Sequence, residues 1–102
     1  MAEIIQGTTP TIVYTFANVS VTDISVAILT LKQNGTVIVE RNLDTAEVGA
    51  SSLSWTLTQE ETLQFTGATI NSMLNWKLAD GTRGASKKGS FAIEDNYVKE
   101  VI

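Results

Sequence analysis

The chain has 102 residues, of which 43% are hydrophobic and 18% charged, and its net charge at pH 7 is −4. A length of about 100 residues is typical of one domain, so we expect residues 1–102 to form a single domain. Cysteine and histidine are both absent, which excludes disulfides, thiol nucleophiles and sites built on histidine. The acidic balance argues against binding to nucleic acid or to an anionic membrane.

The first half of the chain predicts strands and a hairpin. Residues 11–16 are rich in β-branched and aromatic side chains and predict a strand. Residues 24–32 form a longer apolar run, and residues 36–41 follow it with a similar composition. Asn34 and Gly35 between them favour the positive φ values of a type I′ turn, so the two runs predict a β-hairpin.

The first strand of this hairpin is apolar on both faces. A period of two places Ala27 and Leu29 on one face and Val26 and Ile28 on the other, with Ile38 joining the second face from the returning strand. A lone sandwich covers only one face of each sheet. Val26, Ile28 and Ile38 therefore either lie under a loop or the C-terminal segment, or form a candidate interface for a partner or another copy of the chain.

One short helix is expected in the middle of the chain. Residues 52–57 alternate with Trp55 inward and predict a strand. Thr58 and Glu61 fit the capping box that begins a helix, and Gly67 ends the segment after one or two turns. We expect this helix to connect the two sheets.

The last third predicts a second hairpin. Residues 69–78 alternate, Asp80 and Gly81 predict the turn, and residues 85–93 return. The fold class is therefore all-β: an immunoglobulin-like antiparallel β-sandwich with one short connecting helix. The predicted core contains aliphatic and aromatic side chains, namely Ile12, Tyr14, Phe16, Leu29, Leu31, Leu53, Trp55, Leu57, Leu74, Trp76 and Phe91.

Acidic side chains give no sign of catalysis or of a metal site. Asp44 and Glu47 are close in sequence, but calcium sites gather more carboxylates around a glycine turn. Capping accounts for Glu60 and Glu61. With no histidine and no Ser-x-x-Lys motif, nothing activates a hydroxyl. We predict no enzyme activity, no metal and no cofactor.

Basic side chains gather on the second hairpin, in the set Lys77, Arg83, Lys87 and Lys88. Such a set can contact phosphates, or it can protect an edge strand from pairing with another chain. The net negative charge of the whole chain and the presence of a single aromatic residue nearby favour the protection of an edge strand.

Four residues form a second candidate site. If Asn71, Asn75, Trp76 and Tyr97 lie exposed on one face, they provide an aromatic shelf beside polar groups. That arrangement would favour a carbohydrate-binding module that aids adsorption to a host surface.

Three motifs carry a resemblance over nearly the whole chain: GTTP at 7–10, KQNG at 32–35 and LTQEE at 57–61. With them, the chain resembles small immunoglobulin-like proteins encoded in phages and prophages of Gram-positive bacteria. It is also similar to the N-terminal domain of phage baseplate upper proteins. Ser72 stands where the family pattern has an aliphatic residue.

The resemblance implies a non-enzymatic structural module of a phage tail or baseplate, which acts through protein–protein contacts with other tail proteins or with itself. It implies no catalytic residues. Residues 1–6 show no signal-peptide pattern. No apolar run in the sequence approaches the length of a membrane span, which is about 20 residues. We therefore expect synthesis in the bacterial host cytoplasm, followed by association with the virion, and no membrane contact.

Overall fold

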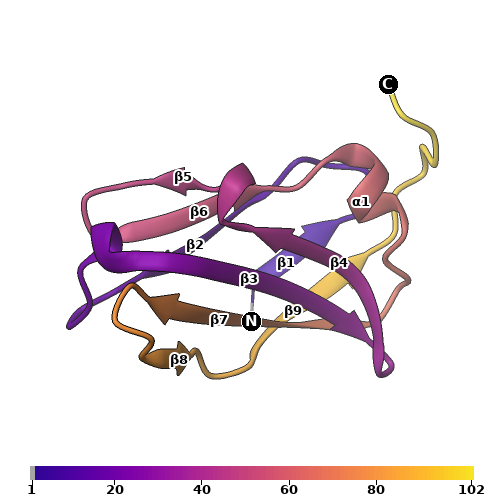
Figure 1. The fold of residues 1–102 in the computed structure, drawn as a ribbon. Helices are drawn as coiled ribbons and strands as arrows, with labels where there is room; N and C mark the ends of the chain where they lie inside the picture. Colours follow the sequence, from indigo (N-terminus) through magenta and orange to yellow (C-terminus); the bar gives the residue numbers. More distant parts are fainter. Residues whose placement is uncertain (1) are drawn as a thin grey trace.

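Two β-sheets pack face to face in a computed structural model that describes residues 2–102 (Figure 1). The six-stranded sheet contains β1 (Ala2–Ile5), β9 (Gly89–Glu94), β7 (Thr69–Leu78), β3 (Ile24–Gln33) and β4 (Thr36–Asn42) in this spatial order, with β8 (Arg83–Ala85) beside β7. The three-stranded sheet contains β2 (Thr11–Thr15), β6 (Ser52–Thr56) and β5 (Glu47–Val48). Short 3₁₀ turns, Val21–Asp23 and Leu43–Thr45, precede β3 and follow β4.

The strand order is that of an immunoglobulin-like sandwich, as predicted. Strands β2, β5 and β6 form one sheet and β3, β4, β7 and β9 the other, which requires Greek-key crossings. The short helix α1 (Gln59–Leu63) makes one of these crossings, from β6 to β7. Both halves of the predicted capping box are present, with Glu61 N donating to Thr58 Oγ1 and Thr58 N donating to Glu61 Oε1.

Strand β1 was not predicted, and it makes the six-stranded sheet mixed. It pairs parallel to β9, whereas the other strand pairs are antiparallel. Its Ile4 is buried in the core. A four-residue strand at the start of the chain becomes recognisable only through its distant partner, because it has no turn signal of its own.

The first hairpin has the predicted turn and an irregularity that was not predicted. Asn34 and Gly35 have φ values of 54° and 79°, as a type I′ turn requires. The register between β3 and β4 then shifts, because Lys32 pairs with Val37 while Leu31 pairs with Val39. Ile38 is the extra residue of this β-bulge.

The second hairpin differs from its prediction. Its turn lies at Asp80 and Gly81, where Thr82 N donates to Asp80 Oδ1 and lowers the pKa of that carboxyl. The prediction of a single returning strand over residues 85–93 is wrong, because two separate strands return: β8 pairs with one half of β7 and β9 with the other. Two adjacent lysines and flanking glycines are poor strand formers, which explains why the chain leaves the sheet between β8 and β9.

The core lies between the sheets and contains the predicted residues. Seven of the predicted side chains are buried and four pack half-buried at the margin, these four being Tyr14, Phe16, Trp76 and Phe91. Tyr14 meets Trp55 edge to face with ring centroids 6.5 Å apart, and Phe16 meets Trp76 at 5.0 Å. Aromatic contacts of this kind add stability beyond the burial of area.

Ser72 is a buried polar residue in β7. Its side chain lies on the inward face with Ile70 and Leu74, as the alternation predicted. The Tyr14 hydroxyl donates to Ser72 Oγ over 3.1 Å, across the two sheets. This bond explains why a serine is tolerated where an aliphatic residue is expected, since a buried hydroxyl without a partner is costly.

Trp55 provides a test of the core. Its side chain is 0% exposed, and its Nε1 donates to the Asn42 backbone oxygen over 2.9 Å. We expect Trp55→Ala to lower the free energy of unfolding by about 3–5 kcal/mol, because it leaves a cavity and removes this bond. Tyr97→Ala is the control, since Tyr97 is fully exposed, and it should change stability by less than about 0.5 kcal/mol. Urea denaturation measures both, and equal midpoints would contradict the assignment.

Candidate interaction surface

The structure places two of the three predicted interface residues on an open surface. Val26 and Ile28 are 44% and 37% exposed, on the side of β3 that faces away from the core. We call this side of the six-stranded sheet the outer face. The predicted exposure of Ile38 is wrong, because its side chain is half-buried and packs against the core. Because of the β-bulge, Val37 takes the place expected for Ile38, and it is 47% exposed.

No C-terminal cover lies over Val26 and Ile28. The C-terminal segment instead lies against α1, where Ile102 N donates to Gln59 Oε1 over 2.9 Å and Gln59 Nε2 donates back to Ile102 O. Figure 1 shows this segment leaving beyond α1, at the end where β9 also finishes. Val26 and Ile28 are therefore accessible.

The β3–β7 register arranges the outer face in cross-strand rows. Val26 lies opposite Lys77, Ile28 opposite Asn75, and Thr30 opposite Met73. Residues directly opposite on antiparallel strands project to the same side of the sheet. The face therefore combines apolar side chains, two amides and several cations.

A groove runs over this face. It has a volume of about 420 Å³ and includes in its lining Lys32, Val37, Asn71, Met73, Asn75 and Lys88. A smaller hollow of about 200 Å³ continues it and is lined by Val26, Ile28, Asn75, Trp76, Lys77 and Arg83. Because Asn75 lines both, the two hollows adjoin, and we call them together the outer groove.

The predicted basic set is partly brought together here. Lys77 and Arg83 are cross-strand neighbours, and Lys88 lines the groove, whereas Lys87 does not. Among residues 2–102 the ion pairs are Arg41–Glu61 and Lys99–Asp95, so the groove cations form none. Arg83 donates a hydrogen bond to the uncharged Asn75 Oδ1 over 3.1 Å. Strand β8 is a short edge strand, but of the four basic residues only Arg83 lies on it.

The four residues of the predicted ligand face do not lie together. Asn71 and Asn75 project to the outer face. Trp76 alternates with Asn75 and pairs with the buried Ala27, and its ring packs against Phe16 while it also lines the smaller hollow. Tyr97 is fully exposed in the C-terminal segment, outside the strands. The condition stated for an aromatic shelf, exposure of all four residues on one face, is therefore not met.

Acidic side chains converge on no site in the described chain. Over residues 2–102, no three Asp or Glu side chains come together as a metal ion would require. Asp44 lies within the 3₁₀ turn Leu43–Thr45, where its N–H donates to the Asn42 side chain, and Glu47 lies in β5. Glu60 occupies the first turn of α1.

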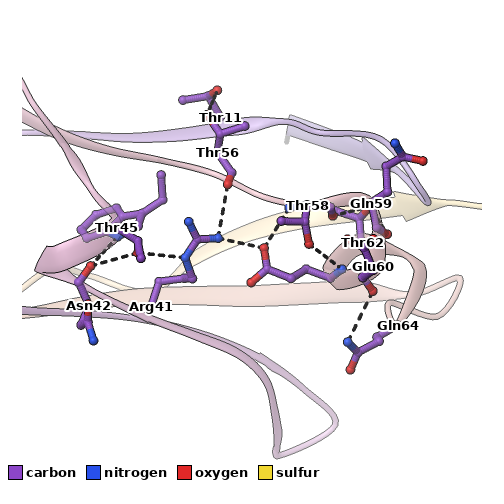
Figure 2. Close-up of polar contacts among 12 residues, drawn as sticks. Thr11, Arg41, Asn42, Thr45, Thr56, Thr58, Gln59, Glu60, Thr62 and Gln64 are labelled. Atoms are coloured by element: carbon purple, nitrogen blue, oxygen red, sulfur yellow. Dashed lines mark hydrogen bonds and ion pairs between the residues drawn. The ribbon is translucent and has the colours of Figure 1, made fainter. Parts of the chain in front are cut away.

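Arg41 holds a polar cluster that the sequence did not reveal (Figure 2). Its Nη1 donates to Glu61 Oε1 over 2.8 Å and to the Thr56 backbone oxygen over 3.3 Å, and its Nε donates to Thr45 Oγ1. Arg41 lies two residues after the inward-facing Val39, so strand alternation places it on the inward side. This alternation was the only feature of the sequence that could have indicated the cluster. The cluster joins β4 to β6 and α1. Every buried side-chain N or O atom in residues 2–102 has a hydrogen-bond partner.

The comparisons with known proteins add information on fold alone. No family model matches the chain, and no curated protein matches it in sequence. Among solved structures, the chain is similar to the crystal structure of CopC from Methylosinus trichosporium OB3b, with 11% sequence identity and a TM-score of 0.59. The match covers 96% of this chain and 89% of CopC. In residues 2–102, no helix has the length and apolar character to cross a membrane.

Val37 and Val39 test the placement of the outer face. They are two residues apart in β4, yet Val37 is exposed and Val39 is only 4% exposed. Val37→Thr should change the free energy of unfolding by less than about 0.5 kcal/mol. Val39→Thr, its matched control, should cost about 1–3 kcal/mol because it buries a hydroxyl. Equal effects in a urea titration would rule out the bulge at Ile38.

Proposed function

We propose that this chain is a non-enzymatic structural module of a phage or prophage tail or baseplate. It assembles with other tail proteins, or with a second copy of itself, through the outer face of its six-stranded sheet. In this role the chain is made in the bacterial host cytoplasm and becomes part of the virion.

The uncovered apolar part of the outer face carries the proposal. Val26, Ile28 and Val37 are all exposed there, on β-strands whose backbone is already hydrogen-bonded to neighbours. Val26 and Ile28 are neighbours and Val37 lies farther along the same face; exposed apolar side chains gathered on one face are typical of interaction surfaces. A flat face on a rigid sheet also loses little conformational entropy when it docks.

The phage-like motifs support the class of protein. Their residues build one end of the sandwich: the Thr62 hydroxyl donates to Thr8 O over 2.8 Å, and the Gln33 amide exchanges two hydrogen bonds with the Thr66 backbone. Thr58 caps α1. The resemblance is therefore carried by contacts that shape the fold, and it suggests the same type of module.

The alternative, a carbohydrate-binding module, has weaker support. Asn71 and Asn75 line the groove and can bond to hydroxyl groups. The aromatic residues that would form a sugar platform lie apart: Trp76 lines the smaller hollow and packs against Phe16, and Tyr97 lies in the C-terminal segment. Binding of the chain to a glycan array, with loss of binding in Asn71→Ala, would favour this alternative.

An assembly experiment tests the proposal. The purified chain is mixed in turn with each purified protein encoded beside it, and sedimentation velocity measures complex formation and self-association. We expect one such complex, and Val26→Asp should weaken it more than about tenfold because a carboxylate would be buried in an apolar contact. Val13→Asp is the matched control, since Val13 is an exposed strand valine on the other sheet.

Two results would contradict the proposal. One is a monomer in every mixture. The other is a complex that Val13→Asp weakens and Val26→Asp leaves unchanged, which would move the interface to the three-stranded sheet.

A further inference from the structure

We propose that the outer groove binds an extended, acidic peptide segment of a partner protein, about six residues long and carrying apolar side chains. This inference rests on the proposed function, since it names the chemistry of the partner that the outer face would receive. It commits to a peptide rather than to a glycan or a nucleic acid.

The charges around the groove favour an anionic partner. Lys32 and Lys88 line the larger part and Lys77 and Arg83 the smaller part. These four are more than half of the seven cations in a chain of net charge −4. None of them forms an ion pair within residues 2–102. Their positive charge is therefore available to a partner.

Acidic side chains lie at the margins of the outer face and do not line the groove. Glu40 is opposite Thr30 on the edge strand β4. Glu3 and Glu94 project outward from β1 and β9, at the opposite edge of the sheet. The groove is thus a basic strip between acidic borders, which disfavours a long polyanion but accommodates a short acidic segment.

The floor of the groove favours a peptide. Val26, Ile28, Val37 and Met73 provide aliphatic contacts, and Asn75 between the two parts offers an amide to a peptide backbone. From Val26 to Lys32 the strand β3 spans about 20 Å, the length of about six extended residues. Single-stranded nucleic acids stack their bases on aromatic platforms, and within residues 2–102 this groove has one aromatic lining residue, Trp76, whose ring packs against Phe16.

A selection experiment tests the class of ligand. A yeast-displayed library of random linear octapeptides is sorted against the intact, folded chain at 150 mM and at 500 mM salt. We expect the enriched peptides to carry net negative charge with interspersed aliphatic residues. Their binding should weaken at high salt, because exposed charge pairs are screened. The best peptide is then synthesised and titrated by NMR, and its shifts should centre on Val26, Met73 and Asn75.

Charge variants locate the site. Lys32→Gln and Lys88→Gln should each lower the affinity for the peptide by about two- to fivefold, as expected for the loss of one exposed ion pair. Lys87→Gln is the matched control, because Lys87 neighbours Lys88 and does not line the groove. It should leave the affinity within experimental error. All three residues are exposed, so the variants should fold, and circular dichroism checks this.

Several results would overturn the inference: no enrichment of acidic peptides, shifts elsewhere on the chain, or equal effects of Lys87→Gln and Lys88→Gln. Binding of heparin or of a single-stranded DNA oligonucleotide that depends on Lys32 and Lys88, without peptide binding, would assign the groove to another class of ligand. If Val26→Asp disrupts assembly with a tail protein while Lys32→Gln and Lys88→Gln do not, the proposed function stands and this inference fails.

Discussion

The pairing of β3 with β7 is the contact on which the rest of the structure depends. These two long central strands align Leu29 with Leu74 on the inward side and Ile28 with Asn75 on the outward side. The same register therefore sets both the core and the outer groove. A slip of one residue would exchange the two faces, so the burial of Leu29, Leu31 and Leu74 also fixes which side chains reach the outside.

The ends of the sandwich are closed by polar side chains that stand in for missing strand partners. The Gln33 amide pairs with the Thr66 backbone much as another peptide group would. At the open edge of β4, Arg41 reaches the backbone of β6 and the carboxylate that caps α1. Because both ionised groups are largely buried, removing one would leave the other without its counter-ion, which costs more than the pair itself contributes.

How far the fold could be predicted depends on how local each signal is. The Asn34-Gly35 turn and the Thr58–Glu61 capping box involve neighbours in sequence, and both are present. Strand β1 depends on a parallel partner nearly ninety residues away along the chain, and nothing near it indicates that pairing. The partnership of Ser72 with Tyr14 is likewise a contact between sheets.

The candidate surface was predicted in part, for a related reason. Alternation in β3 correctly placed Val26 and Ile28 outside. The same rule failed at Ile38, because Ile38 is the extra residue of a bulge, so that Val37 on its turn side lies outside while Val39 lies inside. Trp76 was assigned to a ligand face although its own strand alternation put it inward beside Leu74 and Leu78. For Trp76 the strand alternation predicted the correct side of the sheet, and the ligand-site hypothesis conflicted with it.

Net charge and local charge lead to different conclusions for this molecule. A total of −4 lowers the attraction for long polyanions, whose contacts extend across a whole surface. At physiological ionic strength, however, a charge is felt over about 8 Å, so a segment in the outer groove meets Lys32, Lys77 or Lys88 before it meets the acidic residues on other faces. Such short-range attraction contributes mostly to the rate of association and to the choice of partner. The retention of a bound segment would then depend on the aliphatic floor, which is set by the register of β3 with β7.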